Sequence, residues 1–261
     1  MGPALQGEGP RLNGLTVEHE RGVDRLDLHQ QHTGCRWSTA PHHQRQQHMP
    51  SVRVECRLCE PLRRPRRPMP PAHFVDLCAR FPQLAIDLRY RRSANVTGAP
   101  LPGYGTAEVW LHERVAERLS AAVQALQRAG YGLIVYDAYR PLRAARALAQ
   151  WARDTDQAWL LDGYIAETSR HSRGTAIDLG LLRDGDVVPM GTDFDAFGPD
   201  GHTLNASGAA LDNRLRLRDA MLAAGLEDYR REWWHFDLPA LDAPEQGCPF
   251  LDLRYPSTDG A

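Results

Sequence analysis

The pattern of hydrophobic and polar residues predicts three helices. Apolar positions recur at helical spacing from Ala107 to Ala129, which predicts a long amphipathic helix. A second helix is predicted over Leu142 to Trp151, because Pro141 suits the first turn of a helix. A third is predicted over Leu211 to Ala224, with its arginines on the solvated face (Arg214, Arg216 and Arg218).

Runs of apolar and β-branched residues predict the strands. Gly132 to Tyr136 predicts a buried strand, and Gly174 to Leu182 predicts a strand that the turn residues Asp184-Gly185 fold back into a hairpin. Further strands are predicted over Asp87 to Tyr90 and over Trp233 to Leu238. Helices and strands in this order predict an α+β fold, in which helices pack on one mostly antiparallel sheet.

The first part of the chain differs from the rest. Residues 1–72 mix Gln, Arg, His and Pro without a sustained apolar period, so they bury too little apolar surface to offset the entropy of ordering. We expect this extension to be disordered, or to be mis-annotated if translation starts at an internal methionine. Its Cys56 and Cys59 form a C-x-x-C pair, but no second pair at zinc-finger spacing accompanies them. Residues 73–261 are expected to form a single catalytic domain.

Composition narrows the function classes. A formal net charge of -2 gives no reason to expect a nucleic acid or an anionic membrane as partner. All 31 basic residues are arginines, which excludes a Schiff-base lysine and a P-loop. The chain has neither a run of about 18 apolar residues nor the apolar region of a secretory signal, so we expect a cytoplasmic protein. The oligomeric state stays open.

Two stretches carry the candidate chemistry, Ser169 to Asp178 and Glu232 to His235. They contain two histidines and an aspartate, His171, Asp178 and His235. Catalytic zinc sites use three protein ligands of these types and leave the fourth position open for water. The sequence therefore predicts one zinc ion per chain, held by these three residues.

Two further residues fit a hydrolytic reaction at such a site. Glu232 lies beside the last ligand and is the candidate general base. Strict strand alternation places Glu232 and His235 on opposite faces, so the chain must bend at the strand entry for this carboxylate to reach the site. Arg140 is the candidate for oxyanion stabilisation, because its guanidinium stays charged at any working pH. Asp137 is expected to be its ion-pair partner, and His112 a surface or packing histidine.

The motifs S-x-H-x-x-G-x-A-x-D and E-W-W-H resemble those of the VanX-type D-alanyl-D-alanine dipeptidases, zinc peptidases related to D,D-carboxypeptidases and to the hedgehog zinc domain. The similarity runs from about residue 74 to the end and includes Tyr139-Arg140-Pro141 and Phe194-Asp195. It implies that Glu232 acts as general base and acid and that Arg140 stabilises the transition state. It further implies that Asp195 holds the free ammonium of the dipeptide and that Ser169 lies near its carboxylate.

The resemblance implies hydrolysis of the small dipeptide D-alanyl-D-alanine, in cell-wall precursor turnover or in glycopeptide resistance. Two alternatives stay open. A D,D-carboxypeptidase acting on longer peptidoglycan peptides would need an open pocket, and a non-catalytic zinc-binding module would tolerate loss of the general base or of the arginine. The chain departs from the family pattern in one loop, at Arg91, Arg92 and Val96, so the substrate range is open if that loop borders the pocket.

Overall fold

The computed structural model describes residues 70–105, 108–240 and 248–255. The disorder expected over residues 1–72 and the pair Cys56 and Cys59 fall outside the described residues, except for the short piece 70–72. Within the described part, no helix combines the length and the apolar character needed to cross a bilayer.

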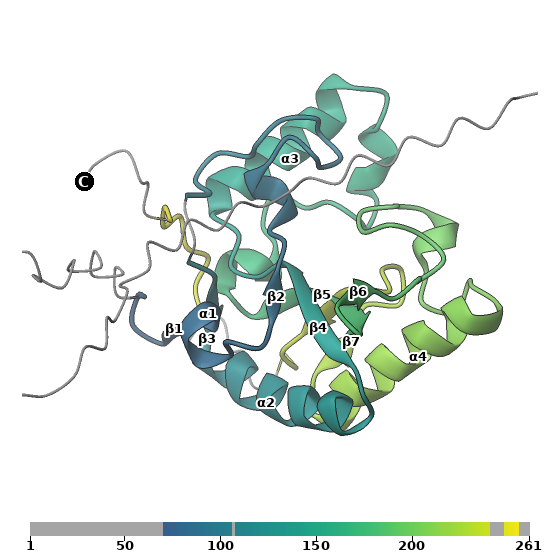
Figure 1. Cartoon of the computed structure of the whole chain (residues 1–261). Helices are drawn as coiled ribbons and strands as arrows, with labels where there is room; N and C mark the ends of the chain where they lie inside the picture. The colour runs from purple at the N-terminus through teal and green to yellow at the C-terminus, as the bar shows by residue number, and fades with distance from the viewer. Residues whose placement is uncertain (1–69, 106–107, 241–247, 256–261) are drawn as a thin grey trace, which may run out of the picture. The chain divides into compact units, whose positions relative to one another are not determined.

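A six-stranded sheet lies at the centre of the described residues (Figure 1). Its strands are β2 (Ala85–Ile86), β4 (Gly132–Asp137), β5 (Ala176–Arg183), β6 (Asp186–Val187), β7 (Glu227–Asp228) and β8 (His235–Asp237). The order is β2-β4-β5-β8-β7, and β6 pairs with β5 across the predicted hairpin turn. Only β2 and β4 run parallel; the other pairs are antiparallel. The predicted α+β architecture with a mostly antiparallel sheet is therefore confirmed.

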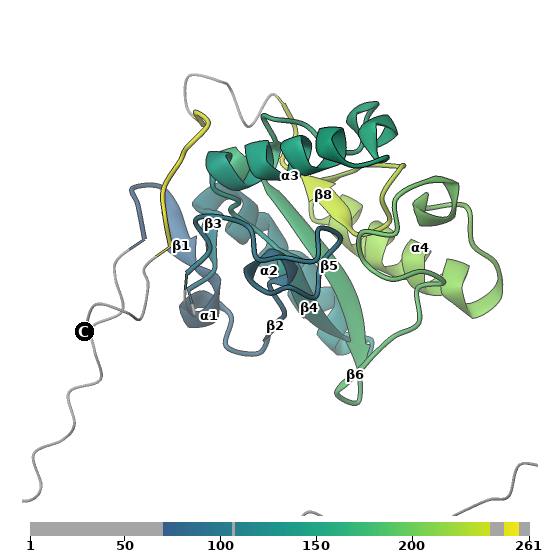
Figure 2. The same ribbon diagram turned by 90° about the horizontal axis from the view of Figure 1, so that it is seen from above.

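Helices cover this sheet and complete the core. The α-helices are α1 (Leu77–Arg80), α2 (Glu113–Arg128), α3 (Leu142–Asp154) and α4 (Gly208–Ala223). Figures 1 and 2 show α2 and α3 on opposite sides of the sheet, and α4 packs beside α2. The apolar stripe of α2 is buried, which is the usual way an amphipathic helix gains stability (Val115, Leu119, Val123 and Leu126).

Two predicted elements are wrong at the N-terminal side of the domain. The helix predicted from Ala107 begins only at Glu113, because Trp110–His112 forms a strand, β3, that pairs with β1 (Phe74–Asp76). The strand predicted over Asp87 to Tyr90 does not form. Strand β2 ends at Ile86, and Arg89–Arg91 turns into a short 3₁₀ helix. In the first case pairing with a second strand, and in the second case a turn, overrides the structure that the local hydrophobic pattern predicts.

Two more predictions need correction near the C-terminal side. The strand predicted from Trp233 starts at His235, because the residues before it form a turn in which the His235 N–H donates to the Glu232 carbonyl at 3.4 Å. The arginine run of α4 does not form a uniformly solvated face. Arg216 is exposed, but Arg214 is completely buried.

Candidate metal centre

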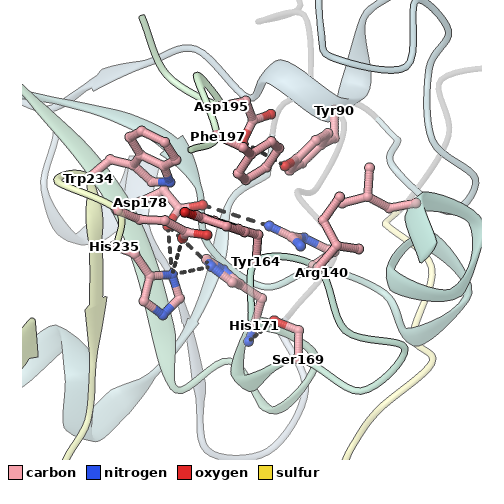
Figure 3. A pocket seen from close by; sticks show the side chains of 13 residues that line it. Tyr90, Arg140, Tyr164, Ser169, His171, Asp178, Asp195, Phe197, Trp234 and His235 are labelled. Carbon is pink, nitrogen blue, oxygen red and sulfur yellow. Dashed lines mark hydrogen bonds and ion pairs between the residues drawn. The ribbon is translucent and has the colours of Figure 1, made fainter. Parts of the chain in front are cut away.

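Three side chains from three different structural elements meet beside the sheet. His171 lies on a 3₁₀ turn, η3 (Arg170–Arg173), that ends at Gly174 in the left-handed conformation just before β5. Asp178 lies within β5, and His235 is the first residue of β8. Asp178 and His235 are direct partners in the antiparallel register. Figure 3 shows the three side chains pointing toward one another.

The geometry of these side chains fits a tetrahedral metal ion. Nδ1 of His235 lies 3.0 Å from Oδ1 of Asp178 and 3.2 Å from Nε2 of His171. Nε2 of His171 lies 3.3 Å from the same oxygen. Ligand bonds of about 2.0–2.1 Å at tetrahedral angles separate neighbouring ligand atoms by roughly 3.3 Å, close to these values. Among the described residues this is the group of histidine, cysteine and carboxylate side chains that can hold a metal ion.

Each histidine is oriented by a second contact. The ring of His171 hydrogen-bonds through Nδ1 to the Ala138 carbonyl oxygen at 2.7 Å, which directs Nε2 to the centre. Nε2 of His235 lies 3.1 Å from Oδ1 of Asp237, which leaves Nδ1 for the centre. Neither of these partners was predicted from the sequence. For Asp237 a signal existed, because a residue two positions after a strand ligand lies on the same face.

Glu232 lies at the edge of this centre. Its carboxylate is buried, and Oε2 is 3.9 Å from Nδ1 of His235. The turn between Tyr229 and His235 provides the bend that the alternation argument requires, because the Glu232 N–H donates to the Tyr229 carbonyl at 2.9 Å. Burial raises the pKa of Glu232 to about 8. A carboxylate in this environment suits the transfer of a proton near neutral pH.

Arg140 lines the same cavity as Glu232 and is fixed by acidic and aromatic neighbours. Its Nε donates to Oδ2 of Asp137 at 2.8 Å, which confirms the predicted ion pair, and its guanidinium carbon lies 4.6 Å from the centre of the Tyr90 ring. Nη2 is 3.7 Å from Oδ2 of Asp178. Burial opposes the charge of Arg140, but Tyr90 and Asp137 raise its pKa well above the ordinary value. Arg140 therefore brings a fixed positive charge to the metal centre.

Asp195 and Ser169 line the same small cavity, of about 40 Å³. Oδ1 of Asp195 accepts a hydrogen bond of 3.0 Å from the Tyr90 hydroxyl, whereas Oδ2 is buried without a hydrogen-bond partner among the described residues. Burial, followed by the charge of Asp178, raises the pKa of Asp195 well above its ordinary value. Oγ of Ser169 accepts a hydrogen bond of 3.3 Å from the His171 N–H. Figure 3 shows Asp195 and Tyr90 on the opposite side of the cavity from His235.

Comparison with known proteins identifies the family. The model of the D-Ala-D-Ala dipeptidase family, peptidase M15, matches residues 71–255. The chain belongs to this family of metallopeptidases. It is 39% identical over 170 residues to the D-alanyl-D-alanine dipeptidase of Escherichia coli, covering 64% of this chain and 84% of that protein. It is 37% identical over 171 residues to the enzyme of the same name from Enterococcus faecium, covering 58% and 84%. The resemblance found in the motifs is confirmed.

The loop in which the chain departs from the family pattern borders a hollow next to Asp195. Val96 and Asn95 line a hollow of about 330 Å³ that Asp195 also borders, but these two residues do not line the metal cavity. Arg92 forms an ion pair with Asp87. Of the three departures, Val96 therefore borders a hollow beside Asp195, and none of the three lines the metal cavity.

Proposed function

We propose that the protein hydrolyses the free dipeptide D-alanyl-D-alanine to two D-alanines with one zinc ion bound to His171, Asp178 and His235. The observation that carries this proposal is the separation of the three ligand atoms by 3.0, 3.2 and 3.3 Å, which matches neighbouring ligands of a tetrahedral zinc site. The names of the similar curated dipeptidases supply the substrate.

The residues around the metal centre have different roles in the proposed hydrolysis. When bound, zinc supplies Lewis acidity toward the scissile carbonyl and toward a water molecule. Glu232 accepts the proton of the attacking water and delivers it to the leaving amine. Arg140 faces the centre with a charge held by Asp137, so it stabilises the negative charge that develops on the carbonyl oxygen.

The end of the cavity that holds Asp195 selects a free amino terminus. The unpartnered Oδ2 of Asp195 is buried, and a buried acceptor without a donor is costly. The ammonium of a dipeptide offers both the donor and the opposite charge. A substrate with a blocked amino terminus leaves this oxygen unpaired, so the site discriminates strongly against it. Ser169, on the side of His171, is the proposed contact of the substrate carboxylate.

The direct test compares D-alanine release from D-Ala-D-Ala and from N-acetyl-D-Ala-D-Ala by the zinc-loaded protein. We expect release from the free dipeptide only, and loss of release in Glu232→Ala. Glu117→Ala is the matched control, because Glu117 is exposed on α2 and far in sequence from the site. Equal cleavage of the blocked substrate would instead assign a D,D-carboxypeptidase, and cleavage of neither would refute the proposed reaction.

Two features of the proposal concern the whole chain. We propose that the catalytic domain starts near residue 73, which is supported by the family match over residues 71–255. The cytoplasmic location, and the disorder or mis-annotation of residues 1–72, stay predictions from the sequence.

A further inference from the structure

The segment that carries Asp195 has little regular structure of its own. Between Met190 and Thr203 it contains only a short 3₁₀ turn, η4 (Pro199–Gly201). Asp195 itself adopts a φ of 63°, a left-handed conformation that is uncommon outside glycine, although aspartate takes it more often than most residues do. Such a conformation persists only where the surroundings hold it. The contacts that fix this segment therefore decide where the Asp195 carboxylate points.

Arg214 supplies four of these contacts from helix α4. Its guanidinium is completely buried and donates hydrogen bonds to both ends of the segment. The acceptors are the carbonyls of Met190 at 2.6 Å, His202 at 2.6 Å and Asp200 at 3.0 Å, and the Thr192 hydroxyl at 3.2 Å. One side chain thus joins the start and the end of the loop on which Asp195 lies.

The chemistry of this contact is unusual for a buried charge. Buried charges in proteins are normally paired with an opposite charge. The four acceptors of Arg214 are three carbonyl oxygens and one hydroxyl, and burial lowers the pKa of Arg214. An arginine suits this task because its planar fork holds five N–H donors in fixed directions, whereas lysine offers three donors at one point.

The same contact reaches the turn that carries Glu232. The Thr192 hydroxyl also accepts a hydrogen bond of 2.9 Å from Nε1 of Trp233, the residue that follows Glu232. The Trp233 N–H donates to the Gly201 carbonyl at 3.0 Å. Arg214 does not line the metal cavity, so its effect on the site passes through these neighbours.

We propose that Arg214 is a positioning residue that sets the specificity of the enzyme for a free amino terminus. It holds Met190–Thr203 closed behind the cavity, so that Asp195 presents its carboxylate to the substrate ammonium. This inference rests on the proposed function, because it takes the ammonium of the dipeptide as the partner of Asp195.

The test is the variant Arg214→Lys, with Arg216→Lys as matched control on the exposed side of the same helix. For Arg214→Lys we expect KM for free D-Ala-D-Ala to rise at least about tenfold, with kcat within roughly threefold of wild type, because misplacing a binding group by about 1 Å has effects of this size or larger. The preference for the free over the N-acetylated dipeptide should fall in parallel. Unchanged KM and unchanged preference would overturn the inference, even if the variant melts at a lower temperature.

A double-variant cycle separates positioning from a general structural role. If Arg214 acts through Asp195, Arg214→Lys should change KM little in an Asp195→Asn background. An equal change in both backgrounds would overturn the inference. Should Arg214→Lys fail to fold, Thr192→Val removes one acceptor of Arg214, and it should raise KM in the same direction by a smaller factor; an unchanged KM in this variant counts against the inference. A wild-type protein without activity on the free dipeptide refutes the proposed function, and this inference falls with it.

Discussion

Asp178 and His235 are direct partners across strands β5 and β8, with Nδ1 of His235 3.0 Å from Oδ1 of Asp178. Two of the three proposed metal ligands are therefore placed by the hydrogen-bonded register of the central sheet. The third, His171, is fixed by its contact with the Ala138 carbonyl at the end of β4. A site built on paired strands keeps its geometry without help from the metal, because the ladder holds the backbone of both ligands.

This arrangement predicts how the protein responds to removal of the metal. Chelation should abolish hydrolysis without unfolding the domain, and added zinc should restore it. Zinc at ~100 times its dissociation constant should stabilise the folded state by about 2.7 kcal/mol, seen as a rise in the melting temperature. In His171→Ala both the restoration and the thermal shift should be greatly reduced. If the melting temperature of the wild-type protein is the same with and without zinc, the proposed ligand set is contradicted.

The buried carboxylate of Glu232 predicts a loss of rate with retention of the metal. Glu232→Gln keeps the shape of the side chain but cannot accept the proton of the attacking water, so kcat should fall about 10²- to 10⁴-fold. Zinc content should stay near one ion per chain, because Glu232 is not a proposed ligand. The exposed Glu117→Gln serves as control. Metal loss in Glu232→Gln would place this residue among the ligands instead.

Substitution of Arg140 should lower the rate for a different reason than substitution of Glu232, because Arg140 contributes a positive charge that is held in a fixed direction. It contacts Asp137 through Nε and lies over the ring of Tyr90. Arg140→Lys keeps the positive charge but loses this planar contact. We expect kcat to fall about 10²- to 10³-fold with little change in KM. Arg146→Lys, on the exposed face of α3, is the control. A change confined to KM would mean that Arg140 binds the substrate without stabilising the transition state.

Residue types led to the prediction of His171, Asp178 and His235 as ligands, and the structure brings these three side chains together. Strand alternation showed only that a bend would be needed for Glu232 to reach them. The sequence could not predict that Trp110 and Leu111 leave the helix pattern, because their partner strand lies more than thirty residues earlier in the chain. Helical periodicity describes one segment, whereas strand pairing depends on a second one. The competition between the two is decided only in the folded domain.

The burial of Arg214 was missed for a related reason. An arginine in a run with Arg216 and Arg218 indicates a solvated helix face when only the helix is considered. The acceptors of Arg214 are mainly backbone carbonyls of an irregular segment. Every residue has a backbone carbonyl, so the residue types do not indicate which carbonyl accepts a hydrogen bond. The same holds for the Ala138 carbonyl that orients His171. The contacts of side chains to the main chain are therefore the part of this site that could not be predicted from the sequence.

The N-cap of helix α2 predicts a pH-dependent stability. His112 is buried, and its Nδ1 accepts a hydrogen bond of 3.3 Å from the Arg114 N–H, so the ring must lack a proton at this atom. Nε2 lies 3.6 Å from Sγ of Cys248, which makes His112 the packing histidine expected from the sequence. Burial lowers the pKa of His112, mainly by penalising the charged ring. Protonation therefore removes the cap and places a charge inside the domain.

The sign of this effect follows from the direction of the shift. Because the folded-state pKa is below the unfolded value of about 6.5, the unfolded chain binds the proton first, and stability falls as the pH drops below about 6.5. His112→Asn keeps a residue type that caps helices but does not titrate, so its melting temperature should fall less between pH 7 and pH 5 than that of the wild type. Gln124→Asn, at an exposed position of the same helix that does not titrate, should keep the wild-type slope. Equal slopes in His112→Asn and in the wild type would show that His112 stays neutral throughout this range or titrates equally in both states.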